Sequence, residues 1–587
     1  MALIIDLPTF FANRSENTKS VEITSSDQGH AMISTSQIIY GDINGFNGVN
    51  NDIFLRDLLK KMECGDYNQC ILGEYAIGYL DQSSRLIVFS RDFSGTRNIY
   101  YSIETNKLII GVNVYDVVKQ LHVRNFNAAI CMEFLAFEYF SAPYTLFNGV
   151  YAIPHGCSII LDHVFNTVKV IRHVSLNEIN ESHDSKWPKS IRDLVVRAHK
   201  KRLTRRNGIY LSGGIDSSIM AISLRKDLNV DNLVAFTFST KGAEQDEFAY
   251  AKRVAGQLGI HCEHIIVDPE EEIDAENLML KANFPYIGAI ILDKIGKHIH
   301  EMGMEGINLF AGQDSRLFTP AYNIVDDLVL NKLLRHSSIR SNVSKLASFI
   351  INRIPTGKVR KGIERLKFAN VISEYFLRYF LHLHRQSDLI FSESLEYVRS
   401  QLKQYTTSAD ARILFNAFVD YTWDRQHSCD MAYMIGNTKA HGNICNMPYF
   451  DSELACLGAS LSMRERLRLS LGRAGHSQKL ILVNKYPIRQ AYKGDLTKDL
   501  IYRDKAVCVT NHMYLNGALS YYVKKFFLKP RLVEIGLAAR LNLDIVISRA
   551  LTRSGLWTMH DYDDVVETHN CLFLEIIARQ LDITSAV

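Results

Sequence analysis

The stretch from Gly208 to Leu224 constrains the possible folds more than any other part of this sequence. An apolar run, Gly208–Leu211, is followed by Ser212-Gly213-Gly214 and then by an apolar segment of helical character. A strand that ends in glycines and opens a helix aims free backbone N–H groups at one point, where the helix dipole adds partial positive charge. The stretch therefore predicts an anion-binding loop between a strand and a helix.

The same alternation of strand and helix continues downstream. Short apolar runs at Leu233–Phe238, His264–Val267 and Ile307–Phe310 indicate strands, and apolar residues at helical spacing from Phe248 to Leu258 indicate a helix. Continuous apolar strands that alternate with amphipathic helices are typical of an α/β doubly wound parallel sheet. In such sheets ligands bind at the carboxyl ends of the strands, which is where the glycine loop falls.

Residues 1–175 have a different pattern, with short β-like runs separated by Gly, Asn, Asp and Ser. These runs are Gln37–Tyr40, Leu86–Ser90, Leu108–Val112 and Cys157–Leu161. They predict an antiparallel α+β domain. Residues 176–190 are polar and contain a proline, which is typical of an interdomain linker. We therefore predict domains at 1–175 and 191–587, joined by a linker at 176–190.

Composition excludes several other classes. Of 587 residues, 47% are hydrophobic, 22% are charged and 11 are proline, which excludes a disordered or collagen-like chain. The net charge of +4 is too small to indicate nucleic acid or a membrane surface. No run of about 18 apolar residues occurs, and the ten cysteines form no CxxC pair. We expect reduced thiols, a cytoplasmic location, and neither a nucleic acid nor a membrane partner.

The side chains of the loop suit a polyphosphate and a metal ion. Gly213 and Gly214 allow the backbone to approach phosphate closely, and Ser212, Ser217 and Ser218 supply hydroxyl donors. Asp216 is a candidate Mg²⁺ ligand. The GxxxxGK[ST] pattern of the common phosphate loop is missing here.

The segment SGGIDSS resembles the pyrophosphate loop of enzymes that cleave ATP between the α and β phosphates. Five further segments resemble, in order, parts of the asparagine synthetases and their relatives: GEYAIGYLD (73–81), SRDFSGTRNIYY (90–101), FNGVYAIPHG (147–156), PYFDSEL (448–454) and IYRDKAV (501–507). The resemblance implies an amidotransferase-like sandwich of the Ntn type, followed by an ATP-pyrophosphatase domain that uses ATP and Mg²⁺. It also implies that Leu211 to Ser218 cradle the nucleotide, that Phe238 and Gly312 frame the adenine, and that Lys505 contacts the polyphosphate during amide formation.

Two departures from the resemblance narrow the expected activity. Glutamine-using relatives carry a nucleophilic cysteine after Met1, whereas this chain has Ala2 and no cysteine before Cys64. We therefore expect no glutaminase activity, so that the amine comes from a substrate. Relatives that lack this cysteine include the β-lactam synthetases and the lasso-peptide macrolactam cyclases, which both close a ring through an amide.

The second departure lies in Phe310–Phe318, FAGQDSRLF. The resemblance makes Asp314 the second Mg²⁺ ligand, whereas Gln313 stands where some relatives place a Glu or Tyr base. Glutamine accepts no proton at neutral pH, so either another group deprotonates the amine or the amine arrives neutral. Arg316 is an alternative group for stabilising phosphate.

Residues 321–410 form a basic and aromatic stretch, with 14 Lys and Arg against 8 Asp and Glu. One interpretation is a helical insertion with a solvated basic face, and the other is a cap over a large or acidic substrate. The second favours a lasso-type macrolactam synthetase whose partners are a precursor peptide and a leader-peptide protease or leader-binding protein. The alternatives are a β-lactam-synthetase-like or other small-molecule amide ligase, and an idle homologue that binds nucleotide.

Overall fold

A computed structural model describes most of the chain. The described residues are 2–6, 21–23, 30–33, 37–44, 74–81, 86–140, 142–162, 167–173, 175–182, 184–244, 247–313, 318, 337–353, 400, 411–466, 468–474, 477–483, 485–501 and 510–587. The predicted site residues Asp314, Arg316 and Lys505 lie outside them, as does most of the segment 321–410.

The N-terminal part contains two antiparallel sheets. The first has the order β10 (Tyr151–Ala152), β7 (Tyr100–Glu104), β8 (Lys107–Gly111), β1 (Ala2–Asp6), β2 (Val21–Ile23). The second has the order β12 (Thr167–Arg172), β11 (Cys157–Asp162), β6 (Leu86–Arg91), β5 (Glu74–Asp81), β4 (Gln37–Asn44), β3 (His30–Ile33). All four runs that the sequence predicted as strands lie in these sheets.

The two sheets share one apolar core. Phe89 of β6 stacks on Tyr101 of β7 with ring centroids 4.4 Å apart. Side chains at alternate positions of both sheets complete this core, because successive residues of a strand point to opposite faces. Two helices, α3 (Val114–Lys119) and α4 (Ala128–Phe137), follow the first sheet in a second, larger core that they share with the rest of the chain.

The predicted linker is partly folded and docked. It contains the 3₁₀ helix η2 (Leu176–Glu178) and the beginning of α5 (Trp187–Lys201). Leu176 is fully buried, and its backbone N–H donates to the carboxylate of Asp420 at 3.1 Å. A segment that reads as a polar connection therefore contributes to the interface between the two parts of the chain.

The second part is built on a parallel five-stranded sheet, which confirms the predicted α/β architecture. Its order is β15 (His261–Val267), β14 (Leu233–Thr240), β13 (Asn207–Tyr210), β16 (Asn308–Phe310), β17 (Ile444–Asn446). Along the chain, β14 and β15 are added on one side of β13, and β16 and β17 are then added on its other side. The direction of winding therefore switches between β13 and β16. Such a switch point leaves a crevice at the carboxyl ends of the strands.

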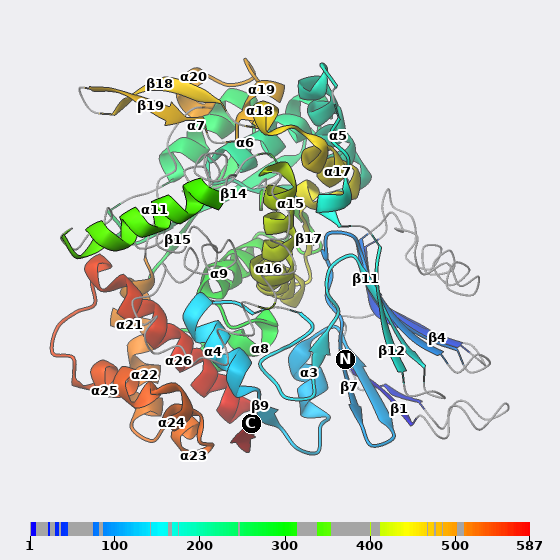
Figure 1. The fold of residues 1–587 in the computed structure, drawn as a ribbon, viewed down its shortest axis with the longest axis vertical. Coiled ribbons are helices and arrows are strands. Elements are labelled where there is room, and N and C mark those ends of the chain that lie inside the picture. Colours follow the sequence, from blue (N-terminus) through cyan, green and yellow to red (C-terminus); the bar gives the residue numbers. More distant parts are fainter. Residues whose placement is uncertain are drawn as a thin grey trace.

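Helices cover both faces of this sheet. On one face lie α5, α6 (Ile215–Ile222), α7 (Phe248–Leu258) and α17 (Ser452–Ser460), and on the other lie α8 (Ala275–Ala282), α9 (Gly288–Glu301) and α16 (Ser428–Ala440). Neighbouring residues of β16 show the division, because Leu309 joins one core and Phe310 the other. Figure 1 shows these helices around the sheet.

The remaining elements surround this framework. They are α11 (Ser337–Ile350), η5 (Ile351–Arg353), α15 (Ala411–Thr422), η7 (Trp423–His427), η8 (Pro448–Phe450), α18 (Met463–Arg466), β18 (Leu469–Ala474), β19 (Ser477–Leu482), α19 (Tyr486–Ala491), α20 (Lys498–Ile501), α21 (Asn511–Asn516), α22 (Ala518–Phe527), α23 (Arg531–Glu534), α24 (Leu537–Leu541), α25 (Leu543–Thr552), η9 (Met559–Asp561), α26 (Tyr562–Gln580), η3 (Ser223–Asp227), β9 (Asn125–Phe126) and β20 (Ser585–Ala586). Through the pairing of β20 with β9, the last helices return the chain to the N-terminal part (Figure 1). Among the helices that the structure describes, none has the length and apolar character needed to cross a membrane.

Candidate nucleotide site

The glycine loop lies at the switch point of the parallel sheet. It leaves β13 at Leu211 and enters α6 at Ile215, with Gly214 as the N-cap residue. Gly213 adopts φ +68°, a conformation that L side chains rarely adopt. A Cβ atom there would lie 2.6 Å from the backbone of Tyr250 and Ala251 in α7, so the close packing of α7 also requires glycine.

The serines of the loop organise its backbone. The Gly214 N–H donates to Ser212 Oγ at 3.2 Å, and the Ser212 N–H donates to Ser217 Oγ at 3.3 Å. Ser217 Oγ in turn donates to the Gly214 carbonyl at 3.2 Å. The Ser218 hydroxyl is buried without a hydrogen-bond partner among the described residues. The loop is therefore a compact cradle at the N-terminus of α6.

Gly312 brings the end of β16 against the same loop. A Cβ atom on Gly312 would lie 2.9 Å from the backbone nitrogen of Ser217. The structure thus places Gly312 next to Leu211 to Ser218, as one side of the switch-point crevice. The next residues that were predicted to act here, Asp314 and Arg316, are not described, so their roles stay predictions.

Asp216, in the first turn of α6, has a partner that sequence reasoning missed. Its carboxylate forms an ion pair with the ammonium of Lys485, and both side chains are mostly buried. Lys485 precedes α19 and has a left-handed backbone conformation, φ +55°. Its one local signal is the proline at the start of the following helix, which marks a boundary and indicates no ligand.

A lysine and a carboxylate beside an anion cradle suit a metal-bound polyphosphate. Mg²⁺ usually takes one or two protein carboxylates together with substrate phosphates, and Asp216 is such a carboxylate. Lys485 is a compact cation at the same place. The residue types present at the loop therefore fit ATP with Mg²⁺, and Asp216 is the described carboxylate that would hold the metal ion.

Phe238 differs from its expected position. The sequence suggested that it ends the second strand of the sheet, but β14 continues to Thr240. The Phe238 side chain is 37% exposed, although Thr240 at the end of the strand is buried. Near this end, Phe248 of α7 stacks on His264 of β15 with centroids 3.6 Å apart.

An acidic group, Asp430, lies next to Gln313, the residue that cannot act as a base. Gln313 Nε2 donates to Asp430 Oδ2 of α16 at 3.5 Å. Burial raises the pKa of Glu138, which caps α4, to about 7, and the negative charge of Asp430 contributes to the increase. Glu138 is thus a carboxyl whose pKa is raised toward neutrality and that interacts electrostatically with Asp430.

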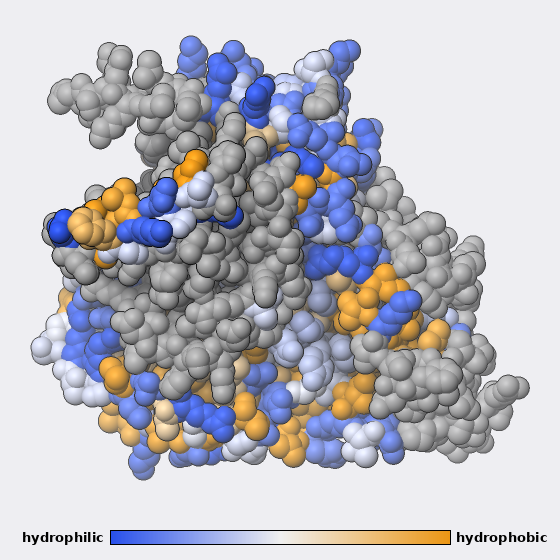
Figure 2. All heavy atoms as spheres, viewed as in Figure 1, coloured by the Kyte–Doolittle hydropathy of each residue, from blue (hydrophilic) through white to orange (hydrophobic). Residues whose placement is uncertain are grey.

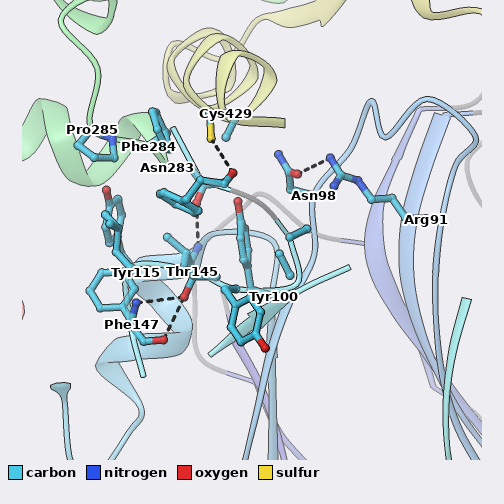
Figure 3. Close-up of a pocket in the computed structure, with 17 residues that line it drawn as sticks. Arg91, Asn98, Tyr100, Tyr115, Thr145, Phe147, Asn283, Phe284, Pro285 and Cys429 are labelled. Carbon is cyan, nitrogen blue, oxygen red and sulfur yellow. Dashed lines mark hydrogen bonds between the residues drawn. The ribbon is translucent and has the colours of Figure 1, made fainter. Parts of the chain in front are cut away.

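A cavity of ≈ 30 Å³ lies between the two parts of the chain, which is room for about two water molecules. Figure 3 shows Arg91 bonded to Asn98 on one side, with Cys429 and Asn283 of the second part nearby. The buried Arg91 guanidinium donates to four acceptors among the described residues of its own domain. These are Arg97 O at 2.6 Å, Ile153 O at 2.9 Å, Gly95 O at 2.6 Å and Asn98 Oδ1 at 2.6 Å. The cavity is therefore too small to hold a substrate. Its arginine already donates to protein acceptors and does not offer a binding group to a ligand.

The parallel sheet, its switch point and the glycine cradle define an α/β nucleotide-binding domain. Comparison with known proteins narrows this class. Residues 190–284 match the family model described as asparagine synthase. This match includes the whole loop and its neighbours β13, β14 and α7.

Curated relatives agree with that match. A putative glutamine-hydrolyzing asparagine synthetase of Methanocaldococcus jannaschii is 25% identical over 222 residues, which cover 36% of this chain and 42% of the relative. A probable glutamine-hydrolyzing asparagine synthetase of Acanthamoeba polyphaga mimivirus is 28% identical over 204 residues, 33% of this chain and 34% of the relative. Amidase chry2 of Gibberella zeae is 22% identical over 275 residues, 41% of this chain and 39% of the relative. The chain thus spans well under half the length of each of these relatives, and the matches support the asparagine synthetase superfamily.

One solved structure with a likeness to the chain is an NH3-dependent NAD synthetase from Campylobacter jejuni. It has 14% sequence identity over 38% of this chain and 95% of that chain, with a TM-score of 0.19.

Proposed function

We propose that this protein is an ATP-dependent ligase that activates a carboxylate as its adenylate and then forms an amide. The observation that carries the proposal is the cradle from Leu211 to Ser218, with Asp216 and Lys485 together beside it at the switch point. The asparagine synthase match covers this cradle and supports the same chemistry.

In the proposed first step, a substrate carboxylate oxygen attacks the α phosphorus and pyrophosphate leaves. The loop amides and Lys485 hold the departing phosphates, where fixed positive charge stabilises the transition state. Mg²⁺ on Asp216 would neutralise phosphate charge. In the second step an amine nitrogen attacks the acyl carbon of the adenylate. The bond between the acyl carbon and the phosphate oxygen breaks, AMP leaves, and the nitrogen gives up a proton.

We assign no residue as the acceptor of the amine proton, because Gln313 accepts no proton at neutral pH. Lys505, which lies outside the described residues, is proposed to stabilise charge during amide formation. Holding both reactants in one site removes a large entropic cost from this step.

We further propose that the amide closes a macrolactam ring in a ribosomal precursor peptide, as in lasso-peptide cyclases. Ala2, which has no nucleophilic atom, starts β1 and is fully buried. An amine already present in the substrate suits a domain that has no nucleophile at this position.

The exposed surface of α11 supports the proposal of a large substrate. This helix is the main described element of the basic and aromatic stretch 321–410. Leu346 and Phe349 of α11 are 60% and 63% exposed, and Figure 2 shows apolar side chains on this helix. The Arg353 guanidinium lies 4.4 Å from the centre of the Phe349 ring. Such a surface suits a peptide better than a small acid.

The test is a mass-spectrometric assay with Mg·ATP and candidate precursor peptides. The expected products are AMP, pyrophosphate and a peptide lighter by one water. AMP release only with small carboxylates and free amines would replace the macrolactam proposal with a small-molecule ligase. Bound but uncleaved ATP would overturn the ligase proposal in favour of an idle homologue.

The variant Asp216→Asn tests the role of the loop carboxylate in ATP cleavage, and Asp293→Asn is its control. Asp293 is also a mostly buried carboxylate in an ion pair, with Lys297 at 2.8 Å, but it lies in α9 away from the loop. We expect Asp216→Asn, like Lys505→Ala, to abolish AMP release and Asp293→Asn to retain it. Full turnover in Asp216→Asn contradicts the proposed role.

A further inference from the structure

Four charged side chains meet in the buried interface between the N-terminal part and the parallel-sheet part. Glu74 of β5 contacts Arg97 at 2.7 Å and Arg202, which follows α5, at 2.5 Å. Arg202 also contacts Asp451 at 3.1 Å. Each of these side chains is at most 4% exposed. Ion pairs this deeply buried are costly to form and strongly sensitive to loss of one partner.

The two carboxylate oxygens of Glu74 connect, through two arginines, to the two ends of the segment 445–451. Through Oε2 it holds Arg97, whose Nη2 also donates to the Cys445 carbonyl at 3.2 Å. Through Oε1 it holds Arg202, whose Nη1 donates to Asp451 Oδ2. Glu74 therefore clamps residues 445–451 at the end of β17 and at the start of α17.

The clamped segment lies against the nucleotide loop. Tyr449, near its middle, is buried, and its hydroxyl donates to the backbone carbonyl of Asp216 at 3.0 Å. The Ala311 N–H, just before Gly312, donates to the Asn446 carbonyl at 2.8 Å. The same segment thus contacts both sides of the switch-point crevice.

The ionic contacts of the cluster favour this arrangement. Burial by itself lowers the pKa of the Arg202 guanidinium, but the carboxylates of Glu74 and Asp451 outweigh that effect and raise it. Each of the two carboxylates contacts two cations: Glu74 contacts Arg97 and Arg202, and Asp451 contacts Arg202 and, at 3.4 Å, Lys201. Because each member is held by others, the cluster restricts where the segment can lie.

We propose that Glu74 is a positioning residue through which the N-terminal domain sets the geometry of the nucleotide loop. The path runs from Glu74 through Arg202 and Asp451 to Tyr449 and the backbone of Asp216. This inference rests on the proposed function, and it gives the N-terminal domain a role in adenylation that needs no glutaminase chemistry.

Glu74→Gln tests the proposal, with Glu133→Gln as its matched control. Glu133 of α4 forms a second buried ion pair across the same interface, with Arg425 of η7, and both side chains are at most 1% exposed. Glutamine preserves the shape of either side chain but removes its charge. Both variants are expected to lower the melting temperature, and of the two glutamates Glu74 is the one whose ion pairs lead to Asp451 and the segment of Tyr449.

We expect Glu74→Gln to raise KM for Mg·ATP by about tenfold, which is the scale of one or two lost hydrogen bonds, and Glu133→Gln to leave this KM unchanged. Tyr449→Phe, which deletes only the final hydroxyl, should raise the same KM. The double variant should show less than the sum of the two effects, since both break one path. Equal KM values in the two glutamine variants, or full additivity with Tyr449→Phe, would overturn the proposal.

Hydrogen exchange of the nucleotide-free protein gives a readout that is independent of turnover. Amides of residues 212–218 should exchange faster in Glu74→Gln than in Glu133→Gln, and unchanged protection contradicts the path. If the wild type releases no AMP, the proposed function fails, whereas this comparison still tests the link. Should Glu74→Gln fail to fold, Asp451→Asn interrupts the same path from the other end and is expected to give the same pattern.

Discussion

The substitution Gly213→Ala probes the central claim about the loop, because its cost can be divided into two parts. One part is the left-handed backbone at φ +68°, which costs an L residue about 1–2 kcal/mol. The other is the collision of the new Cβ with α7, 2.6 Å from Tyr250 C and Ala251 N. An ordinary Cβ contact begins near 3.4 Å, so α7 or the loop must move by about 0.8 Å.

Gly259→Ala supplies the matched control. Gly259 ends α7 with φ +63°, and nothing lies within 4 Å of the position of its Cβ. The backbone cost is therefore common to both variants and cancels in the comparison. What remains is the collision, and overpacking of this kind costs about 1–3 kcal/mol.

Urea denaturation should place Gly213→Ala below Gly259→Ala by that difference in unfolding free energy. AMP release should fall by about 100-fold in Gly213→Ala alone, because a displacement approaching 1 Å misaligns the reacting groups. Equal stabilities would refute the close packing of the loop on α7. Normal turnover in a destabilised Gly213→Ala would refute the role of the loop.

Two further predictions concern Lys485 and Glu138. Lys485→Met should raise KM for Mg·ATP by about tenfold. It should also lower the melting temperature, because it leaves the mostly buried Asp216 carboxylate without this cation. Lys226→Met, which removes a surface lysine paired with Asp495, should leave KM unchanged, and nucleotide titration of both variants measures the difference. Because burial and Asp430 raise the pKa of Glu138 from 4.5 to about 7, the folded protein keeps a proton there that the unfolded chain has released. The stability from this neutral carboxyl is thus present below pH 4.5 and is lost as pH rises through about 7. Glu138→Gln should flatten that part of the stability profile in urea denaturations across this range, and an unchanged slope contradicts the assignment.

Local pattern was a good guide wherever the structure depends on local backbone preferences. The helix from Phe248 to Leu258 has the bounds that its apolar spacing indicated, because its buried face repeats with the helical period. The strands β6 and β11 were recognisable because each is a short apolar run bounded by turn-forming residues. Boundaries that depend on packing were less accurate, since β14 runs two residues beyond Phe238 and α5 begins inside the predicted linker.

The sequence by itself determined the alternation of strands and helices, the glycine loop and the positions of Asp216 and Gly312 along the chain. It also indicated the superfamily, because those residues lie in short contiguous motifs. Tertiary structure alone decided that Lys485, 269 positions after Asp216, is its partner. It also decided that Glu74 joins two arginines and, through them, the segment of Tyr449. Contacts between residues so far apart leave no periodic trace in a sequence, because they arise only when the sheet and its helices have packed and excluded water from the charges between them.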